Sequence, residues 1–104
     1  MQFKETFGQY MRRLREDRKL PIRKVAAHLD IDPSTLSKIE RDERSANKIM
    51  IEKLAELFNV EKKELLITFL SDKIAYDLLS EEFSDEVLKV AEQKIKYRKL
   101  NSAN

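Results

Sequence analysis

Within the segment IDPSTLSKIERDER, residues 31–44, four side chains combine hydrogen-bonding or small character with a spacing that puts them on one side of a helix. Asp32 followed by Pro33 is a typical helix start, because Asp is a favoured N-cap and Pro is accepted at the first helical position. We therefore predict a helix over about 33–41, with Leu36 and Ile39 facing inward. The four side chains on the opposite side are Pro33, Ser34, Ser37 and Lys38. Such a surface can exchange hydrogen bonds with a ligand, although an ordinary capped, solvent-facing helix would look similar.

A second short helix must hold this one in place. Val25, Ala26 and Leu29 share one face of a segment predicted to be helical over about 21–29. Two short helices joined by a three-residue link form a helix-turn-helix motif, whose second helix presents its first turn to DNA base edges in the major groove. Hydroxyl groups can meet donors or acceptors there, and Lys38 can donate to a guanine edge. Thr35 lies at the border of this surface, as either a packing residue or a phosphate contact.

Helical periodicity continues through the rest of the chain, and no strand-like alternation persists. One Gly, two Pro and 38% charged residues are typical of a helical protein. The predicted helices cover about 4–18, 21–29, 33–41, 47–58, 61–79 and 84–99. We therefore expect an all-α fold.

Composition limits the possible functions. The 104 residues contain no cysteine, which excludes disulfides and thiolate metal sites, and contain no run of apolar residues long enough to span a membrane. We expect a cytoplasmic protein with no targeting segment. The net charge is only +2, but residues 1–46 hold 11 basic against 8 acidic side chains, whereas residues 47–104 hold 10 against 11. This bias suits a nucleic-acid partner, and scattered charges on a solvated helical surface are the simpler alternative.

Catalysis is not expected. His28 is the single histidine and has no carboxylate cluster at ligand spacing, so it is predicted to be an ordinary, partly buried residue of the second helix. The chain has no phosphate-binding glycine loop and no nucleophile–base pair. We predict no metal, cofactor or small-molecule substrate.

The chain from Phe7 to Val60 resembles the Xre/Cro-type helix-turn-helix family, the fold of small phage repressors. The matching segments, in the expected order, are LRED (14–17), Leu20, VAAHL (25–29), IDPSTLSKIE (31–40) and LAELFNV (54–60). This resemblance implies a five-helix lambda-repressor-like domain, here with an additional C-terminal helix. It also implies a transcriptional regulator that binds double-stranded DNA.

The resemblance assigns roles to individual residues. Ser34 and Lys38 match the main base-reading positions of the family, with Pro33 beside them. Arg15 and Glu40 match a pair that bridges the first helix to the end of the recognition helix, which is a structural role. The positions matching phosphate-contact regions are Arg41 and Arg44, after the recognition helix, and Arg23 or Lys24, at the start of the second helix.

The chain departs from the family pattern at three places. Arg41-Asp42 replaces a frequent Asn-Gly, so Asp42 would have to adopt a left-handed backbone at some energetic cost. Pro21-Ile22 replaces a polar cap followed by Gln, so a cap and one phosphate contact would be missing. Asp32 and Glu43 add negative charge near the expected DNA, unless the Asp32 carboxylate is engaged with backbone N–H groups.

The segment 61–79 is apolar on more than one helix face, more than a last helix on a small domain can bury. We assign 1–60 to the DNA-binding domain, 61–100 to C-terminal helices that mediate dimerisation, and 101–104 to a frayed tail. The predicted interface residues of a homodimer are Leu66, Phe69, Leu70, Ile74 and Tyr76. A self-contained six-helix monomer is one alternative. Another is a module, of antitoxin type or otherwise, that binds a different protein through its apolar surface.

Overall fold

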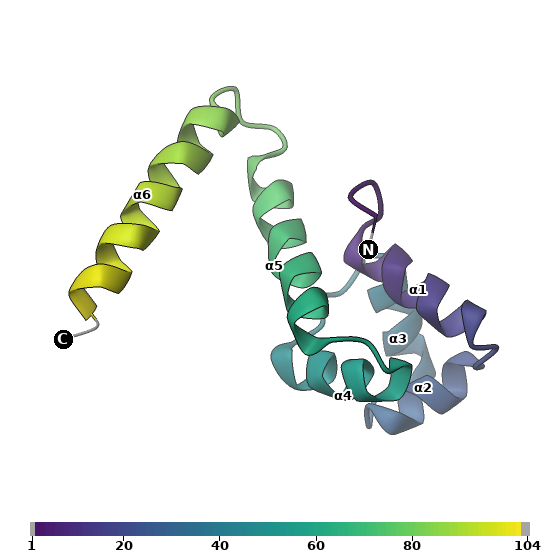
Figure 1. Cartoon of the computed structure of the whole chain (residues 1–104). Helices are drawn as coiled ribbons and strands as arrows, with labels where there is room; N and C mark the ends of the chain where they lie inside the picture. Colours follow the sequence, from purple (N-terminus) through teal and green to yellow (C-terminus); the bar gives the residue numbers. More distant parts are fainter. Residues whose placement is uncertain (1, 103–104) are drawn as a thin grey trace. The chain divides into compact units, whose positions relative to one another are not determined.

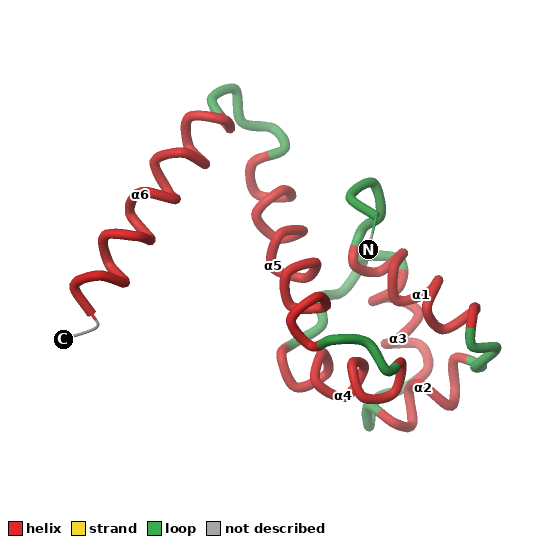
Figure 2. Tube along the Cα trace, in the orientation of Figure 1, coloured by secondary structure: helices red, strands yellow, loops and turns green. Residues whose placement is uncertain are grey.

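The computed structural model describes residues 2–102, which form six α-helices and no strand (Figures 1 and 2). The helices are α1 (Phe7–Asp17), α2 (Ile22–His28), α3 (Pro33–Glu40), α4 (Lys48–Phe58), α5 (Lys62–Leu78) and α6 (Ser84–Ser102). The all-α prediction is confirmed, and each predicted helix end lies within three residues of the observed one. No helix in the described part is long and apolar enough to cross a membrane.

Local sequence explains where the helices begin. Thr6 caps α1 through a capping box, in which its hydroxyl accepts from the Gln9 amide and the Gln9 side chain accepts from the Thr6 amide. Asn47 caps α4 by accepting from the Met50 amide. Asp32 occupies the N-cap position of α3, but its carboxylate makes no capping hydrogen bond. The condition under which this carboxylate would be neutral in effect is therefore not met, and its charge stays exposed.

The chain divides into two compact units, one ending at Lys73 and the other beginning at Ile74, within α5. In the first unit, α2 and α1 each pack against α3. Its core draws on α1 to α4, on the first half of α5 and on two connecting residues, Leu29 and Ala46. The buried apolar side chains are Phe7, Tyr10, Met11, Leu14, Val25, Ala26, Leu29, Leu36, Ile39, Ala46, Ile51, Leu54, Ala55, Phe58, Leu65 and Phe69.

The first unit extends past residue 60, where the sequence placed the end of the DNA-binding domain, because the first half of α5 packs into its core. Leu65 is fully buried, and the Phe69 ring meets the Phe7 ring edge-on, with centroids 5.3 Å apart. The Thr68 hydroxyl is also buried and donates to the Glu64 carbonyl, which satisfies it within the helix. The start of α5 is therefore part of the domain's own core.

The second unit contains the end of α5 and the whole of α6. No residue of α6 is buried. Asp85 and Glu86 lie in its first turn and Lys99 in its last, an arrangement that suits the helix dipole. The helix continues to Ser102, so residues 101 and 102 are helical and not a frayed tail. Residues 103 and 104 lie outside the described part.

Candidate nucleic-acid interface

The link between α2 and α3 is a tight turn closed by backbone hydrogen bonds. Asp30 adopts a left-handed conformation with φ 56°. The amides of Asp30 and Ile31 donate to the carbonyls of Ala27 and Ala26 at 3.2 and 3.0 Å. These hydrogen bonds close the turn immediately after α2, and α3 begins at Pro33. The two helices therefore form a helix-turn-helix unit.

The outer side of α3 carries polar side chains that have no partner in the described part of the chain. Leu36 and Ile39 are buried and fix the inner side of the helix. The sequence places four side chains opposite them. Of these, Pro33, Ser34 and Lys38 are exposed and Ser37 is half-buried. Within residues 2–102, Ser34, Ser37 and Lys38 make no side-chain hydrogen bond or ion pair, so their donors and acceptors are open to a ligand.

Arg15 joins α1 to the last residue of α3. Its Nε and Nη2 donate to the two carboxylate oxygens of Glu40 at 2.7 and 3.0 Å, and its Nη1 donates to the Leu20 carbonyl at 3.0 Å. The Glu40 side chain is 5% exposed, and its hydrogen bond raises the pKa of the Arg15 guanidinium. A bidentate pair of this kind fixes direction as well as distance, so it sets the orientation of α3 against α1.

The candidate phosphate contacts differ in whether they already form an ion pair with another side chain. Arg23 and Lys24 are exposed on the first turn of α2, and Arg44 is exposed after α3. None of these three forms an ion pair in the described part of the chain. Arg41 instead pairs with Glu43, which lowers the pKa of that carboxyl group. Thr35 is half-buried at the edge of the exposed surface.

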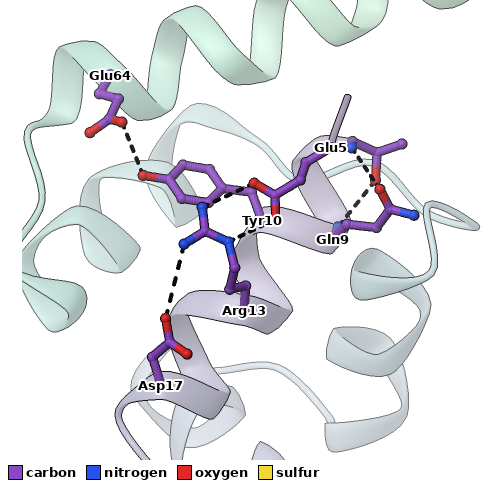
Figure 3. Close-up of polar contacts among 7 residues, drawn as sticks. Glu5, Gln9, Tyr10, Arg13, Asp17 and Glu64 are labelled. Atoms are coloured by element: carbon purple, nitrogen blue, oxygen red, sulfur yellow. Dashed lines mark hydrogen bonds and ion pairs between the residues drawn. The ribbon is translucent and has the colours of Figure 1, made fainter. Parts of the chain in front are cut away.

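Arg12 and Arg13 of α1, and Arg18 directly after it, make contacts with other residues of the chain. Arg13 makes a bidentate pair with Glu5 at 2.8 and 3.0 Å and lies over the Tyr10 ring (Figure 3). Arg18 donates to the Phe58 carbonyl at 2.6 Å and stacks over the Phe58 ring. Arg12 pairs with Glu16 on the same helix at 2.7 Å. Arg13 and Arg18 therefore stabilise the domain through contacts that a phosphate would have to displace.

Two carboxylates that the sequence analysis did not assign hold the N-terminus of α1. Asp42 accepts from the Gly8 amide at 3.1 Å and from the Thr6 hydroxyl. Asp72, on α5, accepts from the Phe7 amide at 2.7 Å. The left-handed backbone predicted for Asp42 is confirmed, with φ 60°. Its contact with α1 depends on a long-range approach for which the local sequence carries no signal.

The five residues assigned to a dimer interface lie in different environments on α5. Leu70, Ile74 and Tyr76 are exposed, by 43%, 50% and 80%. Leu66 is half-buried against the core. Phe69 is only 4% exposed, because its ring packs on Phe7, so a partner cannot reach it without disrupting the domain.

The remaining titratable candidate is His28. It is exposed on α2, and not partly buried as the sequence suggested. Across residues 2–102, no group of three or more metal-ligating side chains comes together. Nothing in this arrangement links His28 to the surface of α3.

Comparison with known proteins supports the same motif. A helix-turn-helix family model matches residues 11–65, which covers α2 to α4 and the adjoining parts of α1 and α5. The HTH-type transcriptional repressor RghR of Bacillus subtilis (strain 168) is 35% identical over 63 residues, which is 60% of this chain and 47% of RghR. The HTH-type transcriptional regulator RghRB of the same organism is 39% identical over 61 residues, or 58% of this chain and 44% of RghRB.

A solved structure shows the same fold. The restriction-modification controller protein C.AhdI from Aeromonas hydrophila aligns with a TM-score of 0.52 and 34% identity, over 57% of this chain and 89% of C.AhdI. The chain spans about half the length of the two curated relatives, and the similarity lies in the helix-turn-helix region. The family that matches consists of transcription regulators and not of enzymes. The chain therefore belongs to the Xre/Cro-type helix-turn-helix family of DNA-binding transcription regulators.

Proposed function

We propose that this protein binds specific sequences in double-stranded DNA as a homodimer, with α3 in the major groove. The observation that carries this proposal is that α3 has polar side chains open to solvent on one face and is held to the domain on the other. Ser34 and Lys38 are exposed and make no side-chain hydrogen bond among residues 2–102, whereas Glu40 on the same helix is fixed by Arg15. A rigid helix with unpartnered donors on its first turns has the geometry that base reading needs.

Phosphate contacts would fix the register of α3 on the duplex. Arg23 and Lys24 on α2 and Arg44 beyond α3 are exposed cations that form no ion pair with the residues the structure describes, so they supply charge without breaking such contacts. Arg41 contributes more weakly, because a phosphate must compete with Glu43 for its guanidinium. Asp32 is exposed at the N-terminus of α3 and opposes the approach of a phosphate.

Dimerisation would double these contacts. A single small module buries little surface on DNA, whereas a pair on two half-sites gains affinity and reads a palindrome with half-sites about one helical turn apart. Leu70, Ile74 and Tyr76 supply exposed apolar surface on α5 for such an interface, with Leu66 at its edge. We leave Phe69 out because it belongs to the core.

The physiological role follows from the relatives by analogy. RghR is named a repressor and C.AhdI a restriction-modification controller, so we propose transcriptional repression or control of a nearby operon. An antitoxin role would use the same DNA contacts but would also need a protein partner.

Selection from a random duplex pool tests the proposal. We expect an enriched palindromic site and an affinity that falls steeply with salt, because each phosphate contact releases a counterion. A Lys38→Ala protein should enrich a more degenerate site than the parent. Affinity for random duplex that does not change with salt would overturn the DNA-binding proposal.

A second candidate function is binding of a different protein by the apolar surface of α5. The exposed Ile67, Leu70 and Ile74 lie at helical spacing and favour this possibility as much as a homodimer. Sedimentation equilibrium separates the two. A dimer mass that falls in Ile74→Lys, but not in the exposed control Ser80→Lys, supports the homodimer, whereas a monomer mass for the parent favours the second candidate.

A further inference from the structure

α6 carries an apolar stripe that nothing in the described part of the chain covers. The stripe residues are Val87, Leu88, Ala91 and Ile95. They are one, three and four residues apart, so they share one side of the helix. Val87, Leu88 and Ile95 remain 44%, 45% and 52% exposed. No residue of α6 is buried, so this stripe is free to pack against another helix.

The two ends of this helix have opposite charges. Residues 81–86 contain four carboxylates and no basic side chain, namely Glu81, Glu82, Asp85 and Glu86. Residues 94–99 contain four basic side chains and no acidic one, namely Lys94, Lys96, Arg98 and Lys99. The stripe lies between an acidic end and a basic end.

Most of these charged side chains form no ion pair in the described part of the chain. The helix rises about 1.5 Å per residue, so Asp85 and Arg98 lie about 20 Å apart along it. Lys96 pairs with Glu92 one turn away at 2.8 Å. Within residues 2–102, the other charged side chains of both ends form no ion pair. The opposite charges therefore call for a partner that runs in the other direction.

We propose that α6 binds α6 of a second copy of this chain in an antiparallel orientation. This proposal rests on the homodimer proposed above and adds a contact through α6 to the one through α5. With Ala91 at the twofold axis, Val87 of one copy meets Ile95 of the other, so the apolar stripe covers itself. The acidic end of each helix then lies beside the basic end of its partner. A parallel pair would instead place acid beside acid and base beside base.

The chain's own α5 matches these charges less well as an occupant of the stripe. In a helical hairpin the basic end of α6 would face the first turn of α5. That end, residues 61–64, holds Lys62 and Lys63 beside the carboxylates of Glu61 and Glu64, and so has no net charge. A second copy of α6 offers four carboxylates at the matching end. Charge complementarity therefore favours a second copy.

Charge reversal in the full-length protein tests this proposal. Arg98→Glu/Lys99→Glu and Glu81→Lys/Glu82→Lys should each raise the dimer dissociation constant by roughly tenfold or more, because several like-charge contacts form at the two equivalent ends. The chain carrying all four substitutions should return to within a few-fold of the parent, because opposite charges again meet. The single reversal Lys89→Glu, on the side opposite the stripe, is the control and should change little. Circular dichroism should show parental helix content for every variant.

Cysteine cross-linking tests the orientation of the two α6 helices. Because the sequence contains no cysteine, only the introduced residues can form a disulfide. A mixture of Val87→Cys and Ile95→Cys chains should form a disulfide between unlike chains under oxidised glutathione. Each variant alone should stay largely unlinked. Strong self-linking of Val87→Cys alone would indicate a parallel pair and overturn the proposal.

Further outcomes separate this inference from the proposed function. A parent dimer that no charge reversal weakens would remove the α6 contact and leave the homodimer in place. Failure of the fourfold reversal to restore the dimer would point to the chain's own α5, or another surface, as the occupant. A monomeric parent would remove both dimer proposals, whereas salt-dependent DNA binding would survive on its own measurement.

Discussion

The Asp42 carboxylate accepts a hydrogen bond from the Gly8 amide at 3.1 Å and joins the turn after α3 to the first turn of α1. The first turn of α1 has no acidic residue of its own, so Asp42 supplies the negative charge that the helix N-terminus favours. The Thr6 hydroxyl donates to the second oxygen of the same carboxylate. A left-handed residue that seemed a costly replacement for glycine thus contributes a tertiary helix cap.

The single glycine of the chain lies on the other side of this contact. A Cβ at Gly8 would lie 2.4 Å from the Ile39 carbonyl oxygen and 2.7 Å from that of Glu40. No real Cβ fits at such distances, so α1 approaches the end of α3 as closely as its backbone permits. Gly8 and Asp42 together fix the end of α3 against α1.

Replacement of Asp42 by glycine should lower stability, although glycine is the more comfortable residue in a left-handed turn. Loss of hydrogen bonds to a charged acceptor costs about 1.5–3 kcal/mol, and relief of the backbone returns about 1 kcal/mol. We expect a net loss of about 1 kcal/mol in the free energy of unfolding, measured in urea. Asn tolerates the same backbone and keeps one acceptor oxygen. The free energy of unfolding of Asp42→Asn should therefore lie between those of the parent and of the glycine variant. A glycine variant as stable as the parent would contradict the capping role.

Gly8→Ala should destabilise the protein although alanine is the better helix former. The added methyl group must displace two backbone carbonyls, and overpacking of this kind costs about 1–3 kcal/mol, at the upper end here. Helix propensity favours alanine by about 1 kcal/mol, so we expect a net loss of about 2 kcal/mol. The exposed Ala27→Gly, in α2, measures the propensity effect alone in the same chain. A more stable Gly8→Ala protein would mean that α1 and α3 separate at little cost.

Much of this arrangement could be predicted from the sequence, and the exceptions have physical causes. Helix positions follow from apolar spacing and from starts such as Asp32-Pro33, which are local signals. Asp42 and Asp72 contact residues of α1 that lie 34 and 65 positions away in the sequence. These contacts form only once the helices have packed together. Phe69 was assigned to an interface because α5 is apolar on several sides, and periodicity cannot tell which of them docks on Phe7.

Acid should weaken the domain partly through Glu5. Its hydrogen bonds from Arg13 lower the pKa of the Glu5 carboxyl below its ordinary value of 4.5. Because the folded pKa lies below the unfolded one, this contribution is present above about pH 4.5 and is lost as the pH falls through the folded pKa. Glu5→Gln should therefore cost stability at neutral pH and flatten the fall in unfolding free energy between about pH 5 and pH 3.

Urea titrations at several pH values check this prediction. Glu56→Gln changes an exposed carboxyl group on α4 that makes no ion pair in the described part, so it serves as the matched control. Equal flattening in the Glu5 and Glu56 variants would show that the Glu5–Arg13 pair adds nothing specific to the acid response.

Lys38 and Arg44 should affect DNA binding in different ways, because one is assigned to base edges and the other to phosphate. Lys38→Ala should cost about 1–3 kcal/mol on the preferred site and much less on random duplex, which relaxes base preference. Arg44→Ala should weaken all sequences alike and reduce the slope of log affinity against log salt by about 1. Both side chains are exposed and form no ion pair in the described part, so neither change should alter stability.

Salt titrations of each variant on the selected site and on random duplex measure the two effects separately. Arg12→Ala, on the exposed surface of α1, removes one positive charge outside the helix-turn-helix unit, although it also breaks the pair with Glu16. It should leave base preference unchanged and affect the salt slope least of the three. If Lys38→Ala lowers affinity for both duplexes equally, Lys38 contacts phosphate and base reading rests on Ser34 and Ser37.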